Sequence, residues 1–215
     1  MNTTSPSDDD LVPVSRRWRV STAFACVCTS SYLLINNFSL REPILLWKSP
    51  IDDWLPFLAW TVWPYLILLF TDYVFPLWIR SRGLFRVTMR AYAFAAVISF
   101  LFWALLPTTL PRVGFVPSGD GLSEVTYRLL ISMDPPNNCF PSGHISIPTV
   151  VYWGLVQQWP RWRWPLWLSF MLLSLTILTT KQHYVLDLLG GVGAGALGVW
   201  LSLRYEERAK ASRSA

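Results

Sequence analysis

Two histidine motifs contain the residues of this chain that are best suited to chemistry. The first is Pro141-Ser142-Gly143-His144, and the second runs from His183 to Asp187 about forty residues later. His144 and His183 are the only histidines in the 215 residues, and each opens a long apolar stretch. Two imidazoles, a carboxylate and a helix N-terminus are together suited to moving a phosphoryl group.

The first motif predicts the start of a helix. Pro141 cannot continue a preceding helix, Ser142 is a favoured N-cap, and Gly143 lets a ligand approach the backbone closely. Free amides at such a helix end bind phosphate. His144 would lie in the first turn, where it could donate a proton to a leaving group. An ordinary capped helix, with His144 as a polar interfacial residue, fits the same spacing.

The second motif places His183 and Asp187 on one helix face, because they are four residues apart. The carboxylate can accept the proton of one ring nitrogen and leave the other nitrogen free as a nucleophile. A carboxylate inside a membrane is costly and usually functional. A purely structural His–Asp hydrogen bond is the alternative. We expect no metal, because the third protein ligand that a zinc site needs is not evident.

The composition indicates a membrane protein. Hydrophobic residues make up 53% of the chain and charged residues only 14%, whereas soluble domains have about 25% charged residues. Trp settles at membrane interfaces. Seven of the thirteen Trp residues fall near the ends of apolar runs, namely Trp18, Trp47, Trp54, Trp78, Trp159, Trp162 and Trp164.

A membrane-spanning helix needs roughly 20 apolar residues, and six stretches are candidates. They are approximately Val20–Leu40, Trp54–Ile79, Leu84–Leu106, Ser142–Trp159, Trp164–Thr180 and His183–Leu203. The predicted fold is therefore all-α, a six-transmembrane-helix bundle with a long extracytoplasmic loop between helices 3 and 4. We expect a disordered cytoplasmic N-terminus over residues 1–17, a membrane domain over 18–205 and a cytoplasmic tail over 206–215.

The basic residues predict the orientation of these spans. Thirteen of the 18 fall on the side of the chain ends and five, including Arg112 and Lys181, on the other. The positive-inside rule then places both termini in the cytoplasm and both histidines at the extracytoplasmic face. The basic residues lie in short loops and form no stripe along a surface, so a nucleic-acid partner is not expected.

Two further segments have readable patterns. Within the loop 107–141, four apolar residues recur at helical spacing and predict an amphipathic helix on the membrane surface; they are Leu122, Val125, Leu129 and Met133. Gly190-Gly191-x-Gly193-x-Gly195 lies in a predicted span with no preceding strand, which excludes a dinucleotide site. Gly191 and Gly195 form a G-x-x-x-G pair, which favours close helix packing.

The two motifs resemble those of the type-2 phosphatidic acid phosphatase superfamily, which includes sphingomyelin and inositol phosphorylceramide synthases. P-S-G-H matches the middle motif at 141–144, and H-x-x-x-D matches the end of the third motif at His183 and Asp187. Arg112 matches the arginine of the first motif, K-x6-R-P, although Val113 follows it. Ile177 stands where the third motif has arginine, and Lys181 is expected to supply the missing charge.

The resemblance implies a role for each matched residue. His183 would attack phosphorus, Asp187 would orient it, and His144 would protonate the leaving alcohol and then activate water. Arg112 and the amides of Ser142–Gly143 would hold the phosphoryl oxygens. It implies no metal and no other cofactor.

The expected substrate is a phospholipid or a prenyl phosphate, and the expected activity is hydrolysis. Membrane lipids are expected to surround the protein. One alternative is transfer of a phospho-headgroup to a second lipid alcohol. Another is a non-catalytic lipid-binding membrane protein.

Overall fold

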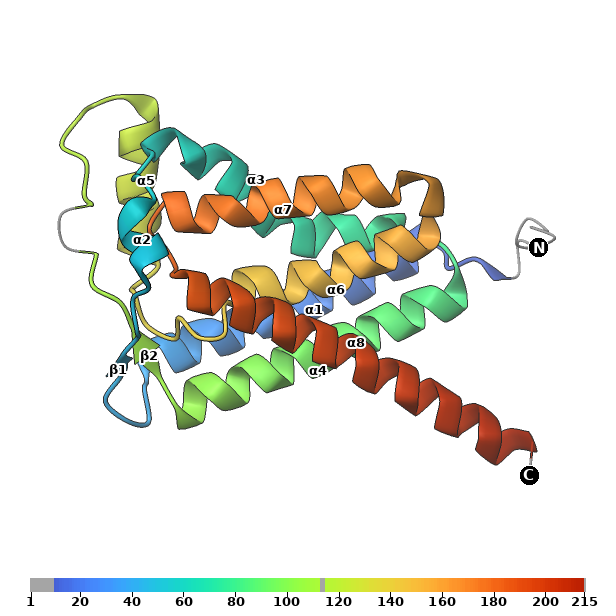
Figure 1. Cartoon of the computed structure of the whole chain (residues 1–215). Helices are drawn as coiled ribbons and strands as arrows, with labels where there is room; N and C mark the ends of the chain where they lie inside the picture. Colours follow the sequence, from blue (N-terminus) through green and yellow to red (C-terminus); the bar gives the residue numbers. More distant parts are fainter. Residues whose placement is uncertain (1–9, 113–114, 215) are drawn as a thin grey trace.

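Six helices of 13 or more residues run side by side in one bundle (Figure 1). They belong to a computed structural model that describes residues 10–112 and 115–214. Their bounds are α1 Val14–Asn37, α3 Val62–Val74, α4 Arg82–Leu105, α6 Gly143–Gln158, α7 Arg163–Thr179 and α8 Val185–Ser214. The all-α prediction is confirmed, and each predicted span overlaps one of these helices.

The shorter elements gather mainly at one end of the bundle. This end holds α2 (Pro50–Trp54), α5 (Leu122–Met133) and the parallel pair β1 (Ile44–Leu45) and β2 (Thr108–Thr109) (Figure 1). The 3-10 turns are η2 (Ala59–Thr61), η3 (Phe75–Trp78) and η4 (Pro160–Trp162). The start of α1 and the end of α8 lie at the opposite end (Figure 1).

The helices differ in length from the predicted spans. The span predicted over residues 54–79 contains α3, which has 13 residues and lies between η2 and η3. Pro76 at the start of η3 removes a backbone donor and ends the regular helix there. By length and composition, α4 and α8 are the described helices that could cross a membrane. The count of six crossings stays a prediction.

The chain ends are more ordered than predicted where they are described. Residues 1–9 of the expected disordered segment lie outside the described residues, but α1 already begins at Val14. Arg17 is buried, and its Nε donates a hydrogen bond of 3.1 Å to the Val12 carbonyl. The prediction of disorder is therefore wrong for residues 14–17. Residues 206–214 of the predicted tail continue α8 as helix.

Glycines allow α8 to pack closely against α6 and α4. A Cβ on Gly191 would lie 2.7 Å from the Ser142 carbonyl oxygen, and one on Gly195 would lie 2.6 Å from that of Ser146. Only a residue without a side chain permits such an approach. The close packing predicted from the G-x-x-x-G pair is confirmed, and it holds the start of α6 against the first turns of α8.

The amphipathic helix predicted in the long loop is present as α5. Its four predicted apolar residues are all exposed, while Tyr127 on the other face is buried. The Tyr127 hydroxyl donates a hydrogen bond of 2.8 Å to the Thr180 carbonyl. This bond ties α5 to the loop that contains His183.

Candidate active site

His183 lies directly before α8, and Asp187 lies in the first turn of that helix. His183 Nδ1 and Asp187 Oδ2 are 3.2 Å apart, which is the expected hydrogen bond. The Tyr184 amide also donates to Asp187 Oδ2, at 2.8 Å. The carboxyl group is fully buried. Because Asp187 accepts the proton on Nδ1, the free lone pair of His183 is on Nε2.

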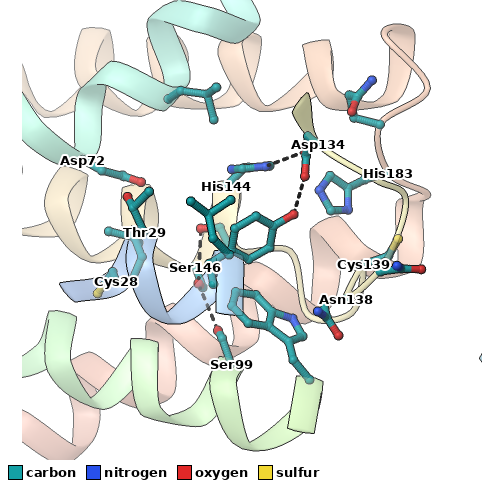
Figure 2. Close-up of a pocket in the computed structure, with 18 of the residues that line it drawn as sticks. Cys28, Thr29, Asp72, Ser99, Asp134, Asn138, Cys139, His144, Ser146 and His183 are labelled. Carbon is teal, nitrogen blue, oxygen red and sulfur yellow. Dashed lines mark hydrogen bonds and ion pairs between the residues drawn. The ribbon is translucent and has the colours of Figure 1, made fainter. Parts of the chain in front are cut away.

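His144 faces His183 across a cavity. It is the second residue of α6, and the centroids of the two imidazole rings are 5.6 Å apart. Figure 2 shows both rings pointing into the same pocket. The edges of two aromatic rings flank His144, with Tyr65 at 5.7 Å and Tyr32 at 6.4 Å between centroids. The structure thus brings the two motifs together as predicted.

Asp134, at the end of α5, is a member of the site that the sequence analysis missed. Its Oδ2 lies 3.8 Å from His144 Nε2, and its Oδ1 accepts a hydrogen bond from the Tyr32 hydroxyl (Figure 2). Burial disfavours the ionised carboxyl, but the contacts with His144, Tyr32 and Arg112 outweigh burial and lower the pKa of Asp134. The ionised carboxylate is a counter-charge for a protonated His144.

Arg112 is held beside the histidines by two hydrogen bonds. Its Nη1 donates to the Asp134 carbonyl at 2.6 Å, and its Nη2 donates to Gln182 Oε1 at 2.7 Å. Two donors remain: within the described residues, Arg112 Nε and Gln182 Nε2 are buried and have no partner. Buried donors without a partner are costly. They are suited to a ligand with several acceptor oxygens, such as a phosphoryl group.

Only part of the Pro141–His144 backbone is free to bind phosphate as expected. Ser142 is the N-cap of α6, but its side chain makes no capping hydrogen bond, and its amide donates to the Asp187 carbonyl at 3.2 Å. That amide is therefore not available to a phosphate. Gly143 does line the cavity, and the first amides of a helix have no partner within the helix. A Cβ on Gly143 would lie 2.9 Å from the Trp103 ring, so Trp103 also requires glycine there.

Lys181 does not reach the cavity, and the prediction that it binds phosphate is wrong for this structure. Its buried Nζ donates to the backbone carbonyls of Asp52 at 2.8 Å and Leu55 at 2.6 Å. Burial and the neighbouring Lys48 lower the pKa of the Lys181 ammonium. The residue adopts φ 53°, in the left-handed region, which is uncommon for a side chain other than glycine, Asn or Asp. Lys181 thus ties its loop to α2.

Asp52 is a second residue that the sequence analysis missed. Its Oδ1 accepts a hydrogen bond of 2.8 Å from the Val185 amide at the start of α8. Its Oδ2 accepts from the amide and hydroxyl of Ser49, at 2.8 and 2.6 Å. The capping-box spacing from Ser49 to Asp52 was a readable signal for α2. Asp52 and Lys181 together hold the segment on which His183 lies.

The cavity has a volume of about 320 Å³, at the lower end of the range for ligand sites. His144, His183, Arg112 and Gln182 line one part of it, and other residues of α1, α3, α4, α5, α6 and the segment 134–139 line the rest. Among the described residues, no group of three His, Cys, Asp or Glu side chains is placed to hold a metal ion.

The site agrees with a comparison against known families. A family model of the PAP2 superfamily matches residues 52–201, which include Asp52, Arg112 and both histidine motifs. Comparison with curated proteins and with solved structures found no further match. The match covers well over half of the chain, His144 and His183 line one cavity, and Asp187 is hydrogen-bonded to His183. The chain therefore belongs to the PAP2 superfamily, the type-2 phosphatidic acid phosphatase superfamily that its two motifs resemble.

Proposed function

We propose that this protein is a membrane-embedded lipid phosphate phosphatase that cleaves a phosphomonoester or diphosphate of a lipid through a phosphohistidine. One observation carries the proposal. The rings of His144 and His183 meet edge to face with centroids 5.6 Å apart, and Asp187 is hydrogen-bonded to His183 Nδ1. A nucleophile and an acid thus line one cavity, and the orienting carboxylate is buried beside the nucleophile.

Formation of the phosphohistidine is the first step. His183 Nε2 attacks phosphorus, the bond from phosphorus to the lipid oxygen breaks, and a protonated His144 gives its proton to that oxygen. Asp187 accepts the hydrogen bond from Nδ1 throughout and stabilises the positive charge that develops on the His183 ring. The lipid alcohol leaves.

Hydrolysis of the phosphohistidine is the second step. Neutral His144 takes a proton from a water molecule as the water oxygen attacks phosphorus. The phosphorus–nitrogen bond breaks, its electron pair returns to His183 Nε2, and inorganic phosphate leaves. His144 is again protonated, with the Asp134 carboxylate 3.8 Å from its Nε2 as the counter-charge.

Arg112, Gln182 and the first amides of α6 are the proposed donors to the phosphoryl oxygens. The unpartnered Arg112 Nε and Gln182 Nε2 supply donors that are already fixed in place. Fixed donors stabilise the charge of the transition state without reorganisation. Gln182 takes the place that the sequence analysis expected for Lys181.

The proposed membrane orientation places this site at the extracytoplasmic face, with both termini cytoplasmic. Of the seven Trp residues expected at the interfaces, all but Trp159 are exposed, and the apolar face of α5 is also exposed. The start of α1 and the end of α8 lie at the opposite end of the bundle from α2 and α5 (Figure 1). The positive-inside count supports this assignment.

Phosphate release from liposomes tests the proposal. The purified protein is reconstituted with phosphatidic acid or a prenyl diphosphate, and inorganic phosphate is measured over time. We expect release by the unchanged protein and loss of at least about 10⁴-fold in the His183→Ala protein. Full activity of the His183→Ala protein would exclude this mechanism.

A further inference from the structure

The cavity beside the two histidines continues into the bundle and reaches a second carboxyl group. Tyr65, Leu69 and Asp72 of α3 all line it. Their spacing of four and three residues puts them on one helix face. With a rise of 1.5 Å per residue, Asp72 lies about 10 Å further along α3 than Tyr65, whose ring contacts His144. Figure 2 shows Asp72 and Thr29 on one side of the pocket and His183 on the other.

The Asp72 carboxyl group has unused hydrogen-bonding capacity. Its Oδ1 is buried, and no side chain or amide of the described residues donates to it. A carboxyl group without a partner inside a membrane helix is costly, and such residues commonly mark a binding site or a pathway. The two proposed chemical steps make no use of Asp72.

Four other polar side chains that line the cavity are paired with each other. Ser99 and Ser146 share a hydrogen bond of 3.2 Å, and Thr29 Oγ1 and the Tyr73 hydroxyl share one of 2.8 Å between α1 and α3. Thr29 and Tyr73 are exposed on the outside of the bundle, so the Asp72 end of the cavity meets the bundle surface between these helices. Asp72 is the acidic group at this end that still lacks a donor.

The wall between the two polar ends is mainly apolar. It is formed by residues such as Leu69, Ala96, Phe100 and Ile147. A ligand that fills the whole cavity therefore has a phosphoryl group at the histidines, an apolar chain in the middle and a hydrogen-bond donor at Asp72. Tyr65, which contacts His144, and Asp72 are about 10 Å apart along α3. This separation sets how far from the phosphoryl group the donor must lie on the apolar chain.

We propose that Asp72 is a specificity-determining residue that binds a hydroxyl or amino group on the apolar chain of the substrate. The proposal rests on the proposed function, because it takes the phosphoryl group to lie at His183. A contact of this kind would distinguish the protein from a phosphatase that recognises only the headgroup and the unsubstituted acyl or alkyl chains of its lipid.

Binding of three alkylphosphonates, which cannot be hydrolysed, tests this directly. They are decylphosphonate and its ω-hydroxy and ω-amino derivatives, titrated into the detergent-solubilised protein. We expect the two derivatives to bind about tenfold more tightly than decylphosphonate, the size of one well-made hydrogen bond to a buried group. The corresponding hexyl compounds, whose chains are too short to reach Asp72, should show no such preference.

Variants assign the preference to one carboxyl group. Asp72→Leu should abolish the preference for both derivatives. Asp72→Asn, which keeps the shape and an acceptor oxygen but no charge, should retain the preference for the hydroxyl and lose that for the amine. Asp120→Asn, a matched change at an exposed carboxylate in the loop before α5, should leave all three affinities unchanged.

Two results would overturn the proposal: equal affinity for all three decyl compounds, or a preference that survives Asp72→Leu. Phosphate release from the matching alkyl phosphates separates this failure from failure of the proposed function. If phosphate is released but the decyl compounds bind with equal affinity, Asp72 does not have the proposed role and the proposed phosphatase function stands. If the derivatives bind more tightly but no phosphate is released, Asp72 binds the donor as proposed and the proposed phosphatase function fails.

Discussion

His183 Nδ1 lies 3.2 Å from Asp187 Oδ2, and the same carboxylate oxygen accepts the amide of Tyr184 at 2.8 Å. Asp187 therefore fixes both the ring of His183 and the backbone that carries it. The Asp187 carbonyl in turn accepts the amide of Ser142, two residues before His144. One residue of α8 thus positions both imidazoles of the site.

Replacing Asp187 by Asn tests this arrangement. The amide can donate to Nδ1 and so favours the tautomer in which Nε2 carries the proton and cannot attack phosphorus. We expect kcat for phosphate release to fall by about 10²–10⁴-fold with little change in KM. The thermal midpoint should fall by a few degrees, because the amide nitrogen that takes the place of Oδ2 no longer accepts from the Tyr184 amide. An Asp187→Asn protein with normal kcat would show that Asp187 is only structural.

Asp52 offers a test of positioning from outside the cavity. Asp52→Ala removes the acceptor for the Val185 amide at the start of α8. We expect a stability loss of about 1–2 kcal/mol and a kcat lowered by about 10–100-fold, with KM changed far less. Asp53→Asn is the matched control, since Asp53 is exposed and pairs with Lys48. If both variants lower kcat equally, the cap on α8 does not position His183.

The close packing of α6 on α8 predicts opposite results at two neighbouring glycines. A methyl group at Gly191 would overlap the Ser142 carbonyl and the Ile145 side chain, whereas one at Gly193 meets nothing within 4 Å. Gly191→Ala should therefore cost about 1–3 kcal/mol and lower kcat, because the start of α6 must move. Gly193→Ala should be neutral or stabilising by up to about 1 kcal/mol. Thermal unfolding in detergent measures both. Equal midpoints for the two variants would contradict the observed helix contact.

Asp134 predicts a pH dependence of stability. Its pKa is lowered in the folded protein, below the value of about 3.9 for an unfolded chain. The ionised carboxylate therefore stabilises the fold at neutral pH, and this contribution is lost as the pH falls from about 4 through the folded pKa. Asp134→Asn should be less stable than the unchanged protein by about 1–2 kcal/mol at pH 7. The difference should shrink at about pH 3. An equal difference at both pH values would count against an ionised Asp134.

The parts of the site that are local in sequence were predictable. The spacing of four residues between His183 and Asp187, and the proline and N-cap before His144, placed both histidines at helix starts. His183 was expected within the helix but lies just before α8, which begins at Val185. Asp52 was not predictable in this way, because its contact with Val185 joins positions 133 residues apart. Asp134 meets Tyr32 across 102 residues.

Lys181 shows how a correct local pattern can mislead about function. A lysine two residues before His183 is near enough in sequence to serve the phosphate. Its side chain instead binds the carbonyl groups at the end of α2, which lie more than a hundred residues away. Only the tertiary contact between α2 and the α7–α8 loop decides between the two roles.

Trapping the phosphohistidine on His183 is the most direct test of the proposed mechanism. In a His144→Ala protein, a prenyl diphosphate still supplies a leaving group that needs little protonation, but water activation is lost. After brief incubation with substrate labelled in the terminal phosphate, peptide mass spectrometry under alkaline conditions locates the label. We expect phosphate on His183, and none in the protein that also carries His183→Ala. Label on another residue, or phosphate release by the His183→Ala protein at the full rate of the unchanged protein, would contradict it.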